Sequence, residues 1–136
     1  MKITKKIFVN MILLFMILLT IESVVAVPTA EIEVDPAEPE RLDTVTFTAT
    51  ITGEEEVEEV ILEVIECNIE DICYNPVDVT MELVGNEYIA ELTLTHDDAT
   101  YIQYKCIITA EGETTETDFF KTDLTITSDN GDVNGN

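Results

Sequence analysis

Three cysteines and one histidine are the residues of this 136-residue chain with the most distinctive chemistry. Cys67, Cys73 and Cys106 could hold a metal, but a structural zinc site needs four ligands with short, paired spacing, which these three do not provide. Cys106 could act as a nucleophile only beside a base that removes its proton. The single histidine, His96, falls in a predicted loop instead. We therefore predict neither a cysteine metal site nor a catalytic thiol.

The segment His96-Asp97-Asp98 is the cluster that most suggests acid and base chemistry. Histidine and aspartate are also ordinary loop residues, and this segment lies between two predicted strands. The sequence has no Gly-x-Ser-x-Gly, no His-Glu-x-x-His and no phosphate-binding glycine loop. A catalytic carboxylate pair would also need a cleft that desolvates one of its members. We predict that the protein is not an enzyme, has no catalytic residue and binds no cofactor.

The last residues contain part of a calcium-binding pattern. Asp132, Asn134 and Asn136 have the alternate spacing with which an EF-hand loop begins. The glycine at the sixth position and the acidic residue at the twelfth are missing, so we predict no metal site here. The stretch Gly131-Asp132-Val133-Asn134-Gly135 nevertheless resembles the opening of a dockerin module. Residues 128–136 are therefore either a polar, disordered tail or the start of a dockerin-like anchor in a longer modular protein.

The first 26 residues have the features of a secretory signal peptide. Lys2, Lys5 and Lys6 precede an apolar run from Ile7 to Ile21, and the small residue Ala26 fits a cleavage site before Val27. An uncleaved signal anchor is the alternative, although an apolar run of about 15 residues is short for the ~20 that cross a bilayer. We expect a secreted or cell-surface protein that, after cleavage, has no attachment to the membrane.

Charge limits the partners that the protein can have. The chain has 29 Asp and Glu residues against 6 Lys and Arg residues, for a net charge of −23. Nucleic-acid binding depends on Lys and Arg side chains that neutralise phosphates, so we expect no nucleic-acid partner. Other protein domains or surface proteins remain as the expected partners, with the oligomeric state open.

Alternating apolar and polar residues predict an all-β domain over residues 27–127. Between Thr44 and Thr52, every second residue is threonine and the residues between them are apolar, which is the pattern of a half-buried strand. Turn residues such as Gly53 and Gly85-Asn86 separate the segments. We expect two packed antiparallel sheets of about seven strands, spaced as in β-sandwiches. The expected strands are Ile32 to Val34, Thr44 to Thr52, Val60 to Glu66, Val79 to Leu83, Tyr88 to Leu94, Ile102 to Ile108 and Thr114 to Leu124.

Several of these segments resemble the immunoglobulin-like and fibronectin type III-like modules of microbial secreted and surface proteins. The resemblance rests on Val34-Asp35-Pro36, Asp43-Thr44-Val45-Thr46-Phe47-Thr48-Ala49, Val60-Ile61-Leu62-Glu63-Val64, Gly85-Asn86-Glu87-Tyr88-Ile89-Ala90 and Ile102-Gln103-Tyr104-Lys105-Cys106, and covers nearly all of residues 30–124. It implies an immunoglobulin-like sandwich. It also implies that the Tyr104 hydroxyl bonds back to the loop before its strand, as in the Tyr-x-Cys pattern of the family.

Strand parity favours one disulfide. If Val60, Leu62 and Val64 face the core, Cys67 falls on the outer side of its strand, while Cys106 shares the inward face of its own strand. We therefore predict a Cys67 to Cys73 bond and a buried free thiol at Cys106. A bulge at the strand end would reverse Cys67 and allow the alternative bond, Cys67 to Cys106.

The outer side of two predicted strands carries a candidate interaction patch. Ile61, Ile65 and Ile107 share this side, and one of the adjacent residues Phe119 and Phe120 must also point outward. Apolar residues gathered on the surface of an acidic protein are typical of a docking surface. The alternative is that they are scattered exposed residues without a partner.

These observations lead to three functional hypotheses. The first is a non-catalytic extracellular immunoglobulin-like module used for cell-surface structure, adhesion or spacing. The second is an accessory domain of a larger secreted carbohydrate-active or proteolytic enzyme. The third is a carbohydrate binder, which would need exposed aromatic side chains; Tyr74 and Tyr101 are its candidates because Tyr88 and Tyr104 are predicted to face inward.

Overall fold

The structure of the protein is a computed structural model that describes residues 5–6, 26–53 and 56–127. Most of the predicted signal peptide, and the whole of the 128–136 segment with its partial calcium pattern, lie outside these residues. In the part that the structure describes, no helix has the length and apolar character needed to span a membrane.

The described residues form an all-β domain with nine strands. They are β1 (Thr29–Asp35), β2 (Thr44–Thr52), β3 (Val57–Asn68), β4 (Val77–Thr80), β5 (Glu82–Val84), β6 (Glu87–Thr93), β7 (Ala99–Ala110), β8 (Glu113–Glu116) and β9 (Phe120–Asp123). Two of the expected strands are each divided in two, which accounts for the difference from the seven predicted by the sequence pattern.

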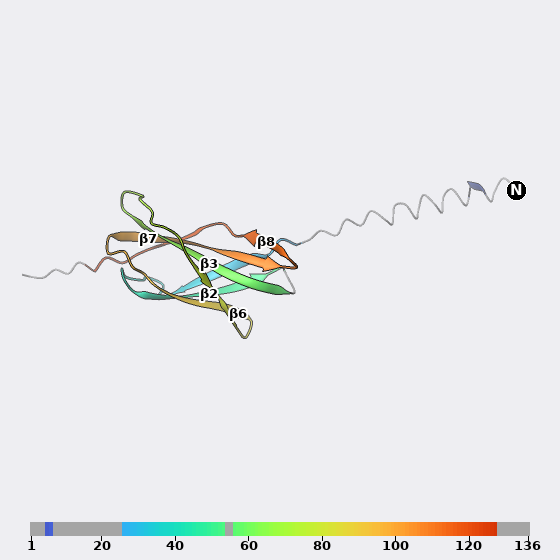
Figure 1. Cartoon of the computed structure of the whole chain (residues 1–136), viewed down its shortest axis with the longest axis horizontal. Coiled ribbons are helices and arrows are strands. Elements are labelled where there is room, and N and C mark those ends of the chain that lie inside the picture. The colour runs from blue at the N-terminus through green and yellow to red at the C-terminus, as the bar shows by residue number, and fades with distance from the viewer. Residues whose placement is uncertain (1–4, 7–25, 54–55, 128–136) are drawn as a thin grey trace, which may run out of the picture.

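The strands form two antiparallel sheets. One has the order β1-β2-β6-β5; the other has the order β4-β3-β7-β8, with β9 also paired to β7. Figure 1 shows the two as layers, with β3, β7 and β8 in one and β2 and β6 in the other. The long strands β3 and β7 pair along most of their length and form the centre of the second sheet.

The core lies between the two sheets and follows the alternation in the sequence. Its buried residues come from alternate positions of β2, β3 and β7, and the largest include Phe47, Leu62, Ile102 and Ile108. Tyr104 lies among them, with its ring 5.2 Å from that of Phe47. Burial of these side chains is the main force that holds the two sheets together.

The strand expected from Val79 to Leu83 does not exist as one element. The chain leaves one sheet at Thr80 and joins the other at Glu82, with Met81 buried between β4 and β5. The backbone N–H of Met81 still donates to the carbonyl of Val60, at 2.9 Å. Leu83 is opposite Tyr88, on the inner side of its sheet, but it is 58% exposed because β5 is a short edge strand.

The strand expected from Thr114 to Leu124 is interrupted between β8 and β9. The register with β7 shifts by one residue there, from Ile107 opposite Glu116 to Tyr104 opposite Phe120. Thr117 fills the irregular position, because its hydroxyl accepts from the N–H of Cys106 and its own N–H donates to the Cys106 carbonyl. Such a bulge reverses which side chains of a strand face inward.

The chain enters and leaves this sandwich at opposite ends. β1 begins where Thr29 pairs with Thr52, next to the connection between β2 and β3. After β9, Thr125 bridges to Glu40 in the connection between β1 and β2, which lies at the other end of the strands. In Figure 1, the blue start of β1 and the red residues after β9 accordingly lie at opposite ends of the long axis.

Candidate functional site

The predicted patch lies on the outer face of the β4-β3-β7-β8 sheet, which we call the isoleucine face. Ile61 of β3 is directly opposite Ile107 of β7, and Ile65 is opposite Gln103. All three isoleucines are half-buried by their neighbours on the sheet. The structure therefore places the three residues on one face, as the alternation predicts, but as a row interrupted by polar side chains.

Lysines and carboxylates interrupt that row. Lys105 lies opposite Glu63, with its ammonium 3.6 Å from the Glu63 carboxylate and 2.6 Å from that of Glu116. The hydrogen bond to Glu116, followed by the charge of Glu63, raises the pKa of Lys105. Lys121 of β9 lies on the same face, opposite Gln103 and 3.6 Å from Asp123. Two of the three Lys and Arg residues after residue 26 are thus on this one face.

Phe119 adds an aromatic ring to the isoleucine face. It is 47% exposed, and the Lys105 ammonium lies 4.8 Å from the centre of its ring. Phe120 points the other way, packs against the core and stacks on Tyr104. The prediction that one of the two phenylalanines faces outward therefore applies to Phe119, and a cation held over an aromatic ring stabilises its position.

The outer face of the other sheet has a different composition. We call it the threonine face, because the threonines of β2 run along its middle. Carboxylates flank them, and within the described residues of this face there is no lysine or arginine. The six carboxylates are those of Glu31, Glu33, Asp35, Glu82, Glu87 and Glu91. This face has the character of a solvated surface, so the two faces of the sandwich differ in what they can contact.

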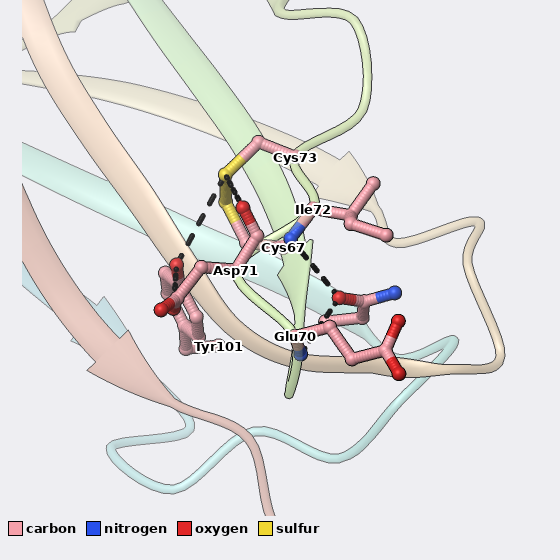
Figure 2. The surroundings of a disulfide bond; sticks show 7 residues. Cys67, Glu70, Asp71, Ile72, Cys73 and Tyr101 are labelled. Carbon is pink, nitrogen blue, oxygen red and sulfur yellow. Dashed lines mark hydrogen bonds between the residues drawn. A yellow bond between two sulfur atoms is a disulfide. The ribbon is translucent and has the colours of Figure 1, made fainter.

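The Cys67–Cys73 disulfide closes a short loop at the end of β3. Figure 2 shows this loop, in which the side-chain oxygen of Asn68 accepts from the N–H groups of Glu70 and Ile72. The Asn68 N–H also donates to the Ile72 carbonyl. Cys67 is buried although it lies on the outer side of β3, because its loop and Tyr101 cover it. The pairing is the one that strand parity predicts.

Two isoleucines at this loop were not singled out by the sequence pattern. Ile69 is 83% exposed and Ile72 is 54% exposed. Their exposure could have been predicted from the sequence, because both lie between the two cysteines of the disulfide and a loop that short cannot bury large side chains. They lie near one end of the strands and not on the isoleucine face.

The two tyrosines considered as binding surfaces are both engaged by the protein itself. Tyr101 is buried, its hydroxyl donates to Asp71 at 3.0 Å, and the Lys121 ammonium lies 4.1 Å from its ring centre. The expectation that Tyr101 is exposed is wrong, because the disulfide loop and Lys121 cover it. The hydrogen bond to Asp71 also raises the pKa of Tyr101.

Tyr74 is half-buried, and one side of its ring stacks on His96 at 3.6 Å between ring centres. Its hydroxyl donates to Asp98, with both carboxylate oxygens at 2.7 Å. This hydrogen bond raises the pKa of Tyr74 and lowers the pKa of Asp98. His96 and Asp98 therefore both contact Tyr74, and these contacts join the loop before β4 to the loop before β7.

Glu66 of β3 contacts the same loop as Tyr74, through Thr95 and His96, and the sequence analysis did not identify it. Its carboxylate is 7% exposed and accepts from the backbone N–H groups of Thr95 (2.9 Å) and His96 (3.0 Å) and from the Thr95 hydroxyl. The His96 Nδ1 atom lies 3.1 Å from the same carboxylate. The alternation of β3 could have identified it, since Glu66 follows Val60, Leu62 and Val64 at the inward positions of the strand. A carboxylate that is buried in this way needs hydrogen-bond donors.

Cys106 is a buried free cysteine, as the parity argument predicts. Its thiol contacts the sulfur of Met81 at 4.0 Å, and burial raises its pKa to about 11. The hydroxyl of Tyr104, two residues earlier, contacts Thr122 of β9 at 3.0 Å. The bond from Tyr104 to the preceding loop, which the family resemblance implies, is therefore not the one that this tyrosine makes.

Among the described residues, no group of three or more His, Cys, Asp or Glu side chains is arranged to hold a metal ion. No known protein family matches the chain, and comparison with curated proteins finds no relative. The function must therefore be argued from the surface and the geometry of this domain.

Proposed function

We propose that this protein is a non-catalytic extracellular module of the immunoglobulin-like kind, used for structure, adhesion or spacing at a cell surface. The order β1-β2-β6-β5 facing β4-β3-β7-β8 supports this assignment. It corresponds to the A-B-E-D sheet and the C′-C-F-G sheet of immunoglobulin-like sandwiches. A shared topology does not by itself give an activity, so the function rests on the features below.

The observation that carries the proposal is the position of the two chain ends. Because β1 starts at one end of the strands and the segment after β9 lies at the other, the domain adds its full length to any chain that contains it. This geometry suits a spacer that presents a face to a partner.

The chemistry of the reactive residues favours a non-catalytic role. The Glu66 carboxylate is occupied by two backbone N–H groups, and the His96 ring is stacked on Tyr74. The Cys106 thiol is buried, with a pKa of about 11, so it is not a nucleophile near neutral pH. Glu66, His96 and Cys106, which could act as base, acid or nucleophile, are therefore each held in contacts that stabilise the fold.

An extracellular location is supported by the Cys67–Cys73 disulfide, since such bonds persist in oxidising compartments. The intact mass of the native protein, measured without reduction after recovery from the medium and surface of its own host, tests the proposal. We expect a chain that starts at Val27 and has one disulfide, which puts its mass two hydrogens below the reduced value. A mass well above that of residues 27–136 would favour the accessory domain of a larger enzyme, and a full-length, fully reduced protein in the cytosol would refute the proposal.

A further inference from the structure

Two carboxylates lie beside the peptide bond at which we predict signal-peptide cleavage. Glu111 is in the turn between β7 and β8, and Glu113 is the first residue of β8. Both line a hollow of about 230 Å³, and its lining also includes Ala26, Val27 and Pro28. The predicted cleavage site, between Ala26 and Val27, is therefore part of an acidic hollow in the folded domain.

The fold fixes the position of Val27 without an intervening linker. Pro28 is buried, and Thr29 pairs with Thr52 at the start of β1. Gly53 approaches from the connection after β2, where a Cβ atom would lie 3.1 Å from the Val27 carbonyl oxygen. Because packed residues follow Val27 directly, a group on its nitrogen is held near the hollow with little further loss of conformational entropy.

The two carboxylates of the hollow have no cationic partner within the described residues, where neither forms an ion pair with a lysine, arginine or histidine. Lys105 and Lys121 pair with other carboxylates. Arg41 donates to the carbonyl of Ala99, at the other end of the strands. A positive charge on Val27 would therefore find Glu111 and Glu113 free to bind it.

We propose that this hollow is the binding site of the mature amino terminus, where Glu111 and Glu113 hold the ammonium group that cleavage creates on Val27. Hydrolysis of the bond by a signal peptidase consumes one water and leaves a carboxylate on the released Ala26. The amine left on Val27 takes up a proton at neutral pH, since α-amino groups ordinarily have pKa values of about 7.7–8.0. The proposal rests on the predicted cleavage site and goes beyond the proposed function.

The other charged groups around the start of the chain act in the same direction. Glu116 and Asp118 line a second hollow beside residues 27–30, and Glu58 accepts from the N–H of Gly112 in the turn. Among the described residues that line the two hollows, all the charged ones are acidic. Nearby negative charge favours the protonated form of an amine, so it should raise the pKa of the Val27 amino group.

This site would make the domain more stable once it is processed. Because the folded-state pKa of the amino group is raised, its contribution to stability is complete below the unfolded value of about 7.7–8.0. The contribution is lost as pH rises through the folded value. A chain that keeps its leader has an uncharged amide at Val27 and gains nothing from the carboxylates at any pH.

Acetylation kinetics of the secreted, processed protein test the proposal. The rate at which the Val27 amino group reacts with acetic anhydride, followed by mass spectrometry from about pH 6 to pH 10, gives its pKa, which we expect above the ordinary range. The double variant Glu111→Gln/Glu113→Gln removes two exposed ion pairs, so its amino group should react about two- to five-fold faster near pH 7.

The matched control is the double variant Glu70→Gln/Glu91→Gln. It removes the same number of exposed carboxylates, but Glu70 is in the disulfide loop at the far end of β3 and Glu91 is on the threonine face. At about 0.15 M salt the charges of both are screened over such distances. Acetylation of Val27 in this control should proceed at the wild-type rate.

Thermal unfolding gives a second readout. Protein acetylated only at Val27 should unfold at a lower temperature than the free protein near pH 6.5, and at the same temperature near pH 10, where the free amine is also uncharged. If the local and the remote variants react at the same rate, or if acetylation destabilises equally at both pH values, the proposal is wrong. Native protein that begins at a residue other than Val27, which its mass shows independently, would also overturn it.

Discussion

Replacing Glu66 by glutamine tests whether the buried carboxylate holds the loop between β6 and β7. Glutamine keeps the shape of the side chain but has only one oxygen, so it can accept from one of the two N–H groups, that of Thr95 or that of His96. The other N–H then faces an amide that is itself a donor. We expect the variant to fold with the same topology but with lower stability.

The expected cost follows from the contacts. Loss of one hydrogen bond to a charged group costs about 1.5–3 kcal/mol, and conversion of the other from a charged to a neutral acceptor costs about 0.5–1 kcal/mol more. The sum is about 2–4 kcal/mol. For a domain of this size, the midpoint of thermal unfolding should fall by at least about 8 °C.

Urea unfolding monitored by tyrosine fluorescence measures this loss, with the slope of the transition expected to stay the same. Glu91→Gln is the control, because Glu91 is exposed on the threonine face, and its effect should stay within about 0.5 kcal/mol. If the Glu66 variant were as stable as this control, the argument that the carboxylate organises the loop would be wrong.

Three further predictions concern the cysteines and tyrosines. Replacing Cys67 and Cys73 by serine should lower the free energy of unfolding by about 2 kcal/mol, since the disulfide closes a short loop in the unfolded chain; a change below about 0.5 kcal/mol in urea unfolding would contradict this. The Cys106 thiol, with a pKa of about 11, should resist alkylation in the folded protein at mildly alkaline pH and react after denaturation, as mass spectrometry would reveal. Hydrogen bonds to carboxylates raise the pKa values of Tyr74 and Tyr101 in the folded state, so the stability that these bonds contribute is complete below the unfolded value of about 10 and is lost as pH rises through the folded values. Ultraviolet titration of tyrosinate in the wild type and in the Tyr74→Phe and Tyr101→Phe variants checks this, because each variant loses the titration of one tyrosine. If the titration lost in either variant has the ordinary tyrosine pKa, the prediction is contradicted.

The alternation of residues was enough to predict the long strands. β2 coincides with the predicted Thr44 to Thr52, and the inward residues of β7 are those that the period of two indicates. Local alternation cannot show where a strand changes sheet, because Met81 keeps its inward position while its neighbours pass from one layer to the other. The Val79 to Leu83 prediction failed for that reason.

The surface was harder to predict than the core. Alternation placed Ile61, Ile65 and Ile107 on one side, but it does not show which polar residues of other strands lie between them. Exposure of Tyr101 was mispredicted because its cover comes from a disulfide loop and from Lys121, both distant in sequence. Such contacts depend on the register between strands, which a single sequence specifies only weakly.

The positions of the chain ends also determine how the domain would respond to a pulling force. A force applied through the two ends acts along the strands, so β1 would have to slide past β2, with which it pairs over seven residues. The hydrogen bonds between β1 and β2 are perpendicular to this force, so they would all bear it at the same time. When two strands are instead pulled apart from one end, their hydrogen bonds break one after another. The disulfide closes a loop that lies outside this path. The mechanical strength of the sandwich would therefore come from the β1–β2 ladder and, at the other end of the chain, from the pairing of β9 with β7.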